Sequence, residues 1–209
     1  MLESWQGSLK AFFSWSLGFT SNGHIVAATN KAEIHVWDAL TGQSVVTFDQ
    51  SISLWNIAFS PNGKMVASFD DDGLLKLWDM QTGEEIYTLA HNDAWITIWS
   101  LVFSPDSEML ASGNFDGNIT FWDTHTGKEV NNLVDPNGSI SSIAFSSDGK
   151  VLATATDSKI ILWDVISKRL IRTVDFDLQV KEGFGIRKVF FSPDGKMIAA
   201  ADANNIAMI

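Results

Sequence analysis

The sequence predicts an all-β protein built from one four-stranded unit that repeats along the chain, and three observations support this prediction. Four Trp-Asp pairs recur in the 209 residues, and their tryptophans, at 37, 78, 122 and 163, are spaced 41, 44 and 41 residues apart. A marker phenylalanine stands 18 or 19 residues before each tryptophan, at 19, 59, 103 and 145. Turn-forming residues separate the short apolar runs between the two markers. A fixed period with internal register indicates a supersecondary unit that stacks on copies of itself.

The third unit shows each expected element in order. A first strand at 100–103 is followed by Ser-Pro-Asp, in which proline presets φ and the aspartate bonds its own backbone. A second strand at 109–112 leads through a turn into a third strand at 119–122. Thr126-Gly127 then predicts a hairpin into a fourth strand. Since no run has a helical period, the chain is predicted to be all-β, and its sheets, apolar on both faces, must cover one another in a radial arrangement.

The composition limits the classes of function. With 14 basic and 25 acidic residues the net charge is −11. A chain this acidic lacks the electrostatic footprint of a nucleic-acid binder and is expected to be repelled by anionic membranes. No apolar run is long enough for a membrane span, and the N-terminus has no basic region of a signal peptide. The chain has no cysteine, which agrees with a cytoplasmic location. The charge is interpreted first as a source of solubility, and attraction of a basic partner ranks second.

These units resemble the WD-repeat β-propeller family over residues 14–209. The resemblance implies four-stranded antiparallel blades at about 14–48, 54–89, 98–134, 140–174 and 186–209, of which the fifth lacks its outer strand and its Trp-Asp pair. The N-terminal segment around Trp5–Leu9 could supply that strand and close a five-bladed ring, which the phase of the repeats favours. The family is typically seven-bladed, so the alternative is a part of a larger propeller, completed by self-association or by blades from another chain.

The resemblance also implies a buried hydrogen-bond network in each blade, made of a histidine, a serine or threonine, an aspartate and the tryptophan of the Trp-Asp pair. The matching residues are His91, Ser112, Asp116 and Trp122 in the third unit, Ser68, Asp72 and Trp78 in the second, and Thr154, Asp157 and Trp163 in the fourth. Because buried polar groups must be satisfied, these residues are interpreted as structural, and none is given a catalytic role.

The sequence contains no motif that indicates catalysis or a bound cofactor. Its four histidines lack the paired spacing of a metal site, and the acidic run 70–72 lacks the alternating ligands and the distal glutamate of a calcium loop. A phosphate-binding glycine loop and a nucleophile elbow are also missing from the sequence. The prediction is a non-enzymatic protein without metal or cofactor, and a small-ligand binder or an enzyme at the channel mouth is the weaker alternative.

A repeated tryptophan predicts the position of a binding surface. Trp15, Trp55 and Trp99 each stand four residues before a marker phenylalanine, and Arg187 takes that position in the fifth unit. In a propeller this position lies near the upstream end of the innermost strand, and the resemblance places it on the top face, where ligands bind. The simpler interpretation, that the indoles plug the channel or pack between blades, has about even weight, because buried aromatic residues are first of all core material.

The predicted function is therefore a scaffold that binds a protein or a peptide on this top face. Asp71 and Phe115 are expected to flank the tryptophans from neighbouring turns. Grouped aromatic side chains suit a peptide that inserts a basic or an aromatic residue. The alternative is a purely architectural role, as a partial propeller that another chain completes.

Overall fold

The computed structural model describes residues 18–19, 25–30, 33–38, 40–49, 54–70, 72–89, 98–156, 158–175, 185–201 and 206–208, and at 18–19, 25–30, 33, 49, 54–55 and 206–208 it describes the backbone alone. In this part of the chain all regular secondary structure is β strand. The strands form four four-stranded antiparallel sheets and one sheet of three described strands. The all-β prediction and the four-stranded unit are confirmed.

Each sheet is a meander, in which strands that follow one another in the chain are paired. The first sheet contains β1 (Gly18–Phe19), β2 (Ile25–Asn30), β3 (Glu33–Asp38) and β4 (Ser44–Asp49). The second contains β5 (Leu54–Phe59), β6 (Met65–Asp70), β7 (Leu75–Asp79) and β8 (Glu85–Leu89). The third contains β9 (Ile98–Phe103), β10 (Met109–Asn114), β11 (Asn118–Asp123) and β12 (Glu129–Val134).

The last two sheets follow the same order. The fourth contains β13 (Ser142–Phe145), β14 (Val151–Ala155), β15 (Lys159–Asp164) and β16 (Leu170–Asp175). The fifth contains β17 (Lys188–Phe191), β18 (Ile198–Ala201) and β19 (Ile206–Met208).

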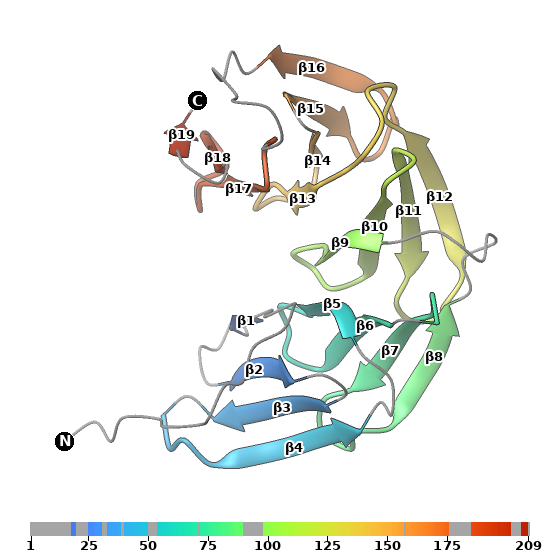
Figure 1. Cartoon of the computed structure of the whole chain (residues 1–209), viewed down its shortest axis with the longest axis vertical. Helices are drawn as coiled ribbons and strands as arrows, with labels where there is room; N and C mark the ends of the chain where they lie inside the picture. The colour runs from blue at the N-terminus through green and yellow to red at the C-terminus, as the bar shows by residue number, and fades with distance from the viewer. Residues whose placement is uncertain are drawn as a thin grey trace.

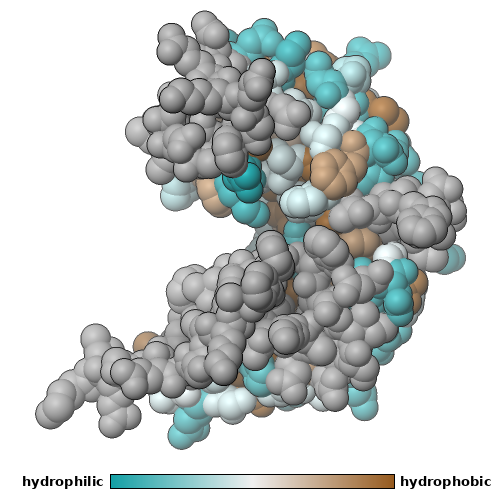
Figure 2. Space-filling view, viewed as in Figure 1, coloured by the Kyte–Doolittle hydropathy of each residue, from teal (hydrophilic) through white to brown (hydrophobic). Residues whose placement is uncertain are grey.

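The five sheets follow one another along an arc, with the first strand of each sheet on the inner side and the fourth strand on the outer side (Figure 1). The inner strands contact one another in chain order, β1 with β5, β5 with β9, β9 with β13, and β13 with β17. The first and fifth sheets lie on opposite sides of the opening of the arc, and the molecule is hollowed there (Figures 1 and 2). The predicted closure of a five-bladed ring by the segment around Trp5–Leu9 involves residues outside the described part of the chain, so it stays a prediction.

The core lies between successive sheets, so each sheet has a backward face toward the preceding sheet and a forward face toward the following one. The second sheet illustrates the pattern: its middle strand β6 is buried at every position, whereas four of the five residues of its outer strand β8 are exposed or half-buried. Strand residues alternate between the two faces, and both faces are apolar because both are covered. β6 therefore begins with the apolar run Met-Val-Ala, and its Ser68 and Asp70 are buried with hydrogen-bond partners.

Side chains on the inner strands also connect one sheet to the next. Ser100 of β9 accepts a hydrogen bond at Oγ from the Ile143 amide of β13 at 2.9 Å, and Ser142 accepts one from the Val189 amide of β17 at 3.2 Å. Both serines stand three residues before a marker phenylalanine and both are buried. These hydroxyls supply acceptors for N–H groups at the inner edge of the next sheet.

The hairpin after each Trp-Asp pair explains why the sequence pattern has this spacing. The Asp123 carboxylate accepts hydrogen bonds from the amides of His125 at 3.0 Å and Thr126 at 2.8 Å, and from the Thr126 hydroxyl at 3.0 Å. Gly127 then adopts a φ of +67°, and a Cβ atom there would lie 2.7 Å from the Tyr87 ring of the second sheet. The aspartate fixes the turn, and the glycine permits both the left-handed backbone and the close approach of the neighbouring sheet.

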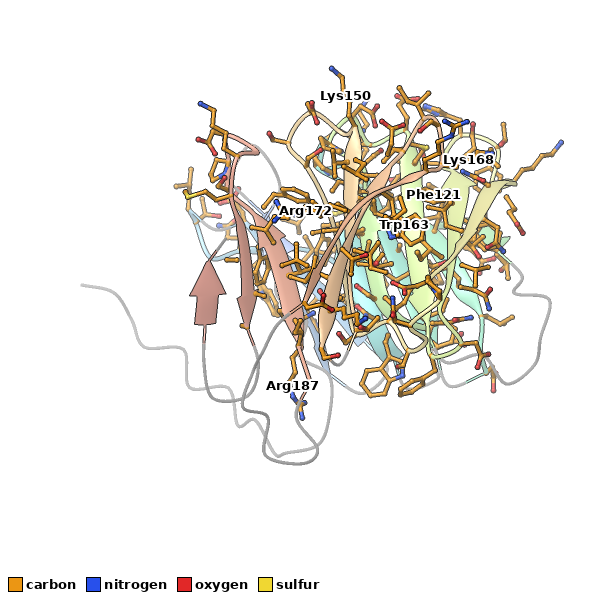
Figure 3. All side chains as sticks on the ribbon, turned by 90° about the horizontal axis from the view of Figure 1, so that it is seen from above. Phe121, Lys150, Trp163, Lys168, Arg172 and Arg187 are labelled. Atoms are coloured by element: carbon orange, nitrogen blue, oxygen red, sulfur yellow. The ribbon has the colours of Figure 1, made fainter. Side chains whose placement is uncertain are left out.

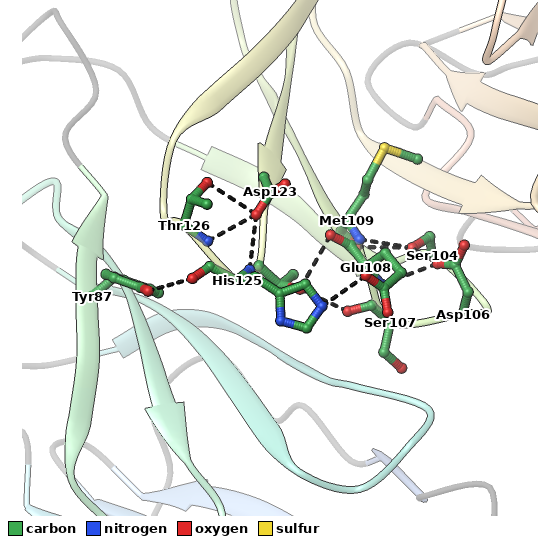
Figure 4. A network of polar contacts seen from close by, with 10 residues as sticks. Tyr87, Ser104, Asp106, Ser107, Glu108, Met109, Asp123, His125 and Thr126 are labelled. Atoms are coloured by element: carbon green, nitrogen blue, oxygen red, sulfur yellow. Dashed lines mark hydrogen bonds and ion pairs between the residues drawn. The ribbon is translucent and has the colours of Figure 1, made fainter.

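A set of polar contacts around this hairpin joins the second sheet to the third (Figure 4). The Tyr87 hydroxyl, from β8, donates a hydrogen bond to the carbonyl oxygen of His125. The His125 ring is in turn 2.7 Å from the Glu108 carboxylate, measured from Nε2 to Oε2. The contact between histidine and glutamate is exposed, so solvent screening leaves it a minor contribution to stability.

Candidate functional site

An exposed aromatic pair lies where the inner strand of the third sheet begins. Trp99 is the second residue of β9, and Phe115 lies in the turn between β10 and β11. Their ring centroids are 4.8 Å apart, and the ring planes meet at 68°, an edge-to-face arrangement. Trp99 is 43% exposed and Phe115 is 50% exposed. Packed aromatic rings that face solvent offer a large contact area to a partner, so this pair is the candidate site.

Polar contacts from two sheets hold the pair in place. The side chain of Asn56, from β5 of the second sheet, donates a hydrogen bond to the Trp99 carbonyl oxygen at 2.7 Å. The turn that carries Phe115 is fixed by buried Asn114, whose Oδ1 accepts hydrogen bonds from the amides of Asp116 at 3.0 Å and Asn118 at 2.9 Å. The backbone beneath both rings is therefore pre-organised, which reduces the entropy lost on binding.

Two charged residues lie at the same end of the sheets as this aromatic pair. Asp116 follows Phe115 in the turn and is exposed. Arg187 is exposed and immediately precedes β17, and it stands four residues before Phe191 as Trp99 stands four residues before Phe103. Figure 3 shows Arg187 at the opposite end of the sheets from Lys150 and Lys168, which lie in turns. The end that carries the aromatic pair thus has a carboxylate beside the rings and a cation on the fifth sheet.

The structure brings together two of the six residues predicted for partner binding. Trp99 and Phe115 contact each other, and Arg187 lies two sheets away at the same end. Trp15 and Asp71 lie outside the described residues, and for Trp55 the structure describes the backbone of β5 alone. The prediction of three adjacent indoles around one mouth is therefore not tested by the described side chains.

The tryptophans of three Trp-Asp pairs are buried and hydrogen-bonded, as the structural interpretation expects. Trp122 donates from Nε1 to the Ser112 hydroxyl at 3.0 Å and is 4% exposed. In the second and fourth sheets Trp78 and Trp163 donate in the same way to Ser68 at 2.9 Å and Thr154 at 3.0 Å. His91 and Asp157 lie outside the described residues.

The aspartates of these predicted networks differ from the expectation. Asp72 and Asp116 are exposed in their turns. The buried polar residues are instead Asp70 and Asn114, at the ends of β6 and β10, which are 2% and 3% exposed. The Asp70 carboxylate accepts from the amides two and four residues later, at 3.1 Å and 2.9 Å. A side chain at the strand end lies under the turn and reaches both amides, which explains why this position is the buried one.

Asp135 is a network residue that the sequence analysis missed. Its Oδ2 accepts a hydrogen bond from the Thr154 hydroxyl at 2.9 Å, and Thr154 accepts from Trp163. Asp135 is 2% exposed, and its Oδ1 also accepts from the Asn137 amide at 2.9 Å. The only sequence signal is the Asp-Pro-Asn-Gly turn before the fourth unit, and nothing in that turn indicates a bond to a strand nineteen residues later.

Hydrogen bonds in the tight turns lower the pKa of six aspartates. In the turns after Phe103, Phe145 and Phe191, the hydroxyl of the serine two residues before the aspartate donates to its carboxylate and lowers its pKa; this group is Asp106, Asp148 and Asp194. In the hairpins after the Trp-Asp pairs, the amide three residues later has the largest effect on the pKa; this group is Asp79, Asp123 and Asp164. These groups are ionised acceptors at neutral pH, which suits a structural role in the turns.

The inner side of the arc contains a mainly apolar pocket of about 560 Å³ between β9, β13 and β17. Its serines, Ser100 and Ser142, already use their hydroxyls as acceptors between sheets. Lys188 lines the same wall and is exposed, and partial desolvation of its ammonium group lowers its pKa. Across the described residues no three histidine, aspartate or glutamate side chains gather as metal ligands. The described segments also include no helix long and apolar enough to cross a membrane.

Comparison with known proteins gives matches along most of the chain. The family model described as WD domain, G-beta repeat, matches residues 42–79, 83–123 and 127–164, more than half of the chain. WD repeat-containing protein SL1-17 of Schistosoma mansoni is 30% identical over 159 residues, which cover 75% of this chain and 52% of that protein. An uncharacterized WD repeat-containing protein of Nostoc is 36% identical over 44 residues, or 21% of this chain and 3% of that protein. The chain thus spans about half of the first relative and a small part of the second.

Each matched segment ends on the Trp-Asp pair of the second, third or fourth sheet, where the tryptophan is buried on the backward face. The repeat model, the regular sheets and the buried Trp–Ser or Trp–Thr bonds agree with one another. The chain belongs to the WD-repeat family.

Proposed function

We propose that this chain is a non-catalytic module that binds a peptide segment of another protein at the end of the sheets where the inner strands begin. Proteins of the WD-repeat family generally serve as scaffolds for protein–protein interactions. One observation carries the choice of surface: Trp99 and Phe115 form an edge-to-face pair, and each is close to half exposed. Interface residues that contribute most to affinity are enriched in tryptophan and lie in clusters, and this pair has both properties.

The chemistry around the pair favours a peptide with a basic or an aromatic anchor residue. An arginine or lysine side chain can lie over the Trp99 indole in a cation–π contact, and the exposed Asp116 carboxylate can attract the same cation. The net charge of −11 adds long-range attraction for a basic segment. Both electrostatic contributions weaken as salt is added, whereas contact with the aromatic rings does not.

A non-catalytic role agrees with the electrostatics of the carboxylates. The aspartates with a clear shift have a lowered pKa, because turn amides and hydroxyls stabilise the ionised form. A general acid at neutral pH needs a shift in the opposite direction. The described part of the site therefore offers surfaces for recognition, and we assign it no reaction.

The test is selection from an immobilised peptide library, followed by affinity measurement for the selected peptides. Trp99→Ala is expected to weaken binding by a factor of about 30 or more, because truncation of a central aromatic typically costs about 2–4 kcal/mol. Phe115→Ala is expected to have a smaller effect in the same direction. Ile166→Ala is the matched control, since Ile166 is 80% exposed in the hairpin after the fourth Trp-Asp pair.

Three results would contradict the proposal. The first is a library from which the folded wild-type chain selects no peptide. The second is equal affinity of Trp99→Ala and Ile166→Ala for the selected peptides. The third is a selected set without basic or aromatic anchor residues, which would leave a binding protein but remove the proposed recognition chemistry.

A further inference from the structure

The hairpin between β15 and β16 differs from the other hairpins that follow a Trp-Asp pair. In the first three units a glycine with a φ of +67° to +76° closes the turn, namely Gly42, Gly83 and Gly127. In the fourth unit Lys168 holds that position, with a φ of +63°. The turn itself is the same, since the Lys168 amide donates to the Asp164 carbonyl at 2.9 Å, as the Gly127 amide does to that of Asp123. A lysine thus stands where the backbone favours glycine.

The side chain of Lys168 has no structural use that explains this position. Besides Lys168, Ser107 is the non-glycine residue with a left-handed backbone in the described segments, with a φ of +66°. Ser107 is buried, and its hydroxyl accepts a hydrogen bond from the Asn62 amide at 3.1 Å. Lys168 is exposed, and among the described residues its ammonium group has no partner. The unfavourable backbone is therefore not offset within the chain, which indicates a use outside it.

The charges around this hairpin also differ from those of the neighbouring units. The positions compared are the residue before the second strand, the left-handed residue and the two residues after it. They hold one cation and two acids in the second unit (Lys64, Gly83, Glu84 and Glu85) and again in the third (Glu108, Gly127, Lys128 and Glu129). In the fourth unit they hold three cations and no acid (Lys150, Lys168, Arg169 and Leu170). A local excess of positive charge thus occurs in a chain whose net charge is −11.

The fold places these cations beside exposed aliphatic side chains. The Lys150 carbonyl accepts a hydrogen bond from the Val165 amide at 2.9 Å, which sets the turn before β14 against the hairpin. Lys150 and Lys168 lie at the same end of the sheets (Figure 3). At the start of β16, Leu170 is 48% exposed and Ile171 is 51% exposed. We define the fourth-hairpin surface as Lys150, Lys168, Arg169, Leu170 and Ile171.

This surface belongs to a complete sheet that has a described sheet on each side. Val165 packs against the cluster between the third and fourth sheets, and Ile160 lies in the cluster between the fourth and fifth. The equivalent positions of the third unit, which the fourth sheet covers, are exposed as well; they hold Lys128, Glu129 and Val130. Packing between sheets therefore leaves this outer edge in solvent in every such unit.

Two aspartates lie in the same turns, and the turns already use their carboxylates. Asp148 accepts hydrogen bonds from the Ser146 hydroxyl at 2.7 Å and the Lys150 amide at 3.1 Å. Asp164 accepts one from the Ser167 amide at 2.6 Å. The Lys150 ammonium is 3.9 Å from the Asp148 carboxylate, and both side chains are more than half exposed, so this pair is weak. The positive charge of the surface therefore remains accessible to a partner.

We propose that the fourth-hairpin surface binds an extended acidic segment of a partner protein. Carboxylates of that segment contact Lys168 and Arg169, since an arginine guanidinium binds a carboxylate through two parallel hydrogen bonds. Its aliphatic side chains contact Leu170 and Ile171. Among the described strands β16 pairs with β15 alone, and an extended segment can pair with the main chain of such an edge strand.

This site is separate from the aromatic pair of Trp99 and Phe115. The strands β13 and β15 run in the same direction, because both are antiparallel to β14. The hairpin after β15 therefore lies at the opposite end of the sheets from the start of the inner strands, as Figure 3 shows for Lys168 and Arg187. One end is suited to a basic or aromatic anchor and the other to an acidic segment.

The overall charge favours a short peptide over other anionic partners. Nucleic acids and anionic bilayers carry dense rows of charge, and a net charge of −11 repels them. A short segment with a few carboxylates meets less repulsion, and its apolar side chains match Leu170 and Ile171. Both the attraction at the site and the repulsion by the rest of the chain weaken as salt is added, and the closer attraction contributes more.

The experiment measures binding of the full chain to two immobilised libraries of short peptides. In one library glutamate alternates with valine, isoleucine or leucine, and in the other glutamine replaces glutamate. The wild-type chain should select peptides from the acidic library, and their glutamine counterparts should bind at least about tenfold more weakly. Trp99→Ala should bind the selected acidic peptides as the wild type does, which separates this test from that of the aromatic pair.

Lys168→Gly is the main variant, because it restores the residue of the other three hairpins. It should weaken binding of the selected peptides at least about threefold, while the urea midpoint stays equal or rises because the left-handed backbone suits glycine. Arg169→Gln should weaken binding to a similar extent, and it carries the test if Lys168→Gly is unfolded. Lys128→Gln is the matched control, since Lys128 is exposed at the position of Arg169 in the third unit. Its effect should stay below about twofold.

Four results would overturn the proposal. The first is a folded wild-type chain that selects no acidic peptide. The second is wild-type affinity of both Lys168→Gly and Arg169→Gln for the selected peptides. Equal effects of Arg169→Gln and Lys128→Gln would show that the peptides respond to net charge alone. Binding of a DNA duplex or of phosphatidylserine vesicles as tight as that of the selected peptides would show a general anion surface instead of a peptide site.

Discussion

Replacement of Gly127 by alanine tests how the sheets are held together, because the methyl group would enter the contact between the second and third sheets. The new Cβ would lie 2.7 Å from Cγ and 2.9 Å from Cδ1 of Tyr87, closer than carbon atoms approach in folded proteins. The Tyr87 ring cannot move freely, since it packs against the cluster that contains Trp122 and its hydroxyl bonds the His125 carbonyl. The substitution must therefore displace the ring or the hairpin.

Two contributions determine the expected loss of stability. Gly127 has a φ of +67°, and a left-handed backbone costs a non-glycine residue about 1–2 kcal/mol. The overlap with Tyr87 adds about 1–3 kcal/mol, the usual range for an overpacked contact. Gly42→Ala is the matched control, because Gly42 has a φ of +68° in the equivalent hairpin and nothing lies within 4 Å of its added Cβ. The control isolates the backbone contribution.

The assay is urea unfolding, followed by circular dichroism, of the wild-type chain and both variants. Gly127→Ala should lower the free energy of unfolding by about 1–3 kcal/mol more than Gly42→Ala does. In a Tyr87→Ala background that difference should disappear, because the group that overlaps the new methyl is gone. Equal losses for the two glycine variants, or a difference that persists without Tyr87, would refute the reasoning.

Three further predictions use the same unfolding assay. Trp122→Ala should destabilise the chain by about 1–3 kcal/mol more than Trp99→Ala, because it leaves a cavity and removes the hydrogen bond that the buried Ser112 hydroxyl accepts. Similar midpoints would contradict the structural role of Trp122. Asp135→Ala should lower the free energy of unfolding by about 1–3 kcal/mol, whereas Asp116→Asn should change it by less than about 0.5 kcal/mol. A larger loss for Asp116→Asn than for Asp135→Ala would show that Asp116 belongs to the buried network. Because the turn aspartates have a lowered pKa in the folded chain, the stability that they contribute is fully present above about pH 4, the pKa range of unfolded aspartate. This contribution is lost as the pH falls through the folded-state pKa. A urea midpoint that rises from pH 5 to pH 3 would exclude this.

Much of the fold was predictable because local chemistry sets it. The turn after a marker phenylalanine needs no distant partner, since the Ser104 hydroxyl and the Asp106 carboxylate fix it within a few residues. The same holds for the hairpin of Asp123 and Thr126. Repetition of these local signals defined the four-stranded sheets, and burial of the Trp-Asp tryptophans followed from their register.

The site and the polar networks were less predictable because they depend on contacts between distant segments. Asp135 is buried because it meets Thr154 across nineteen residues, and no local pattern indicates that bond. Asn114 was overlooked because an asparagine at the end of a strand resembles ordinary turn chemistry until its burial is known. The partner, the cytoplasmic location and the lack of a cofactor stay predictions.

The serines on the inner strands affect how readily the chain pairs with other molecules at high protein concentration. The inner strand of each sheet is an edge strand, and exposed edge amides readily pair with a strand from another molecule. Ser100 and Ser142 occupy the amides of Ile143 and Val189, so these donors are already satisfied by a side chain and are unavailable to an incoming backbone. At the fourth and fifth sheets a serine hydroxyl from the preceding sheet thus blocks one inner-edge amide from pairing with the strand of another molecule.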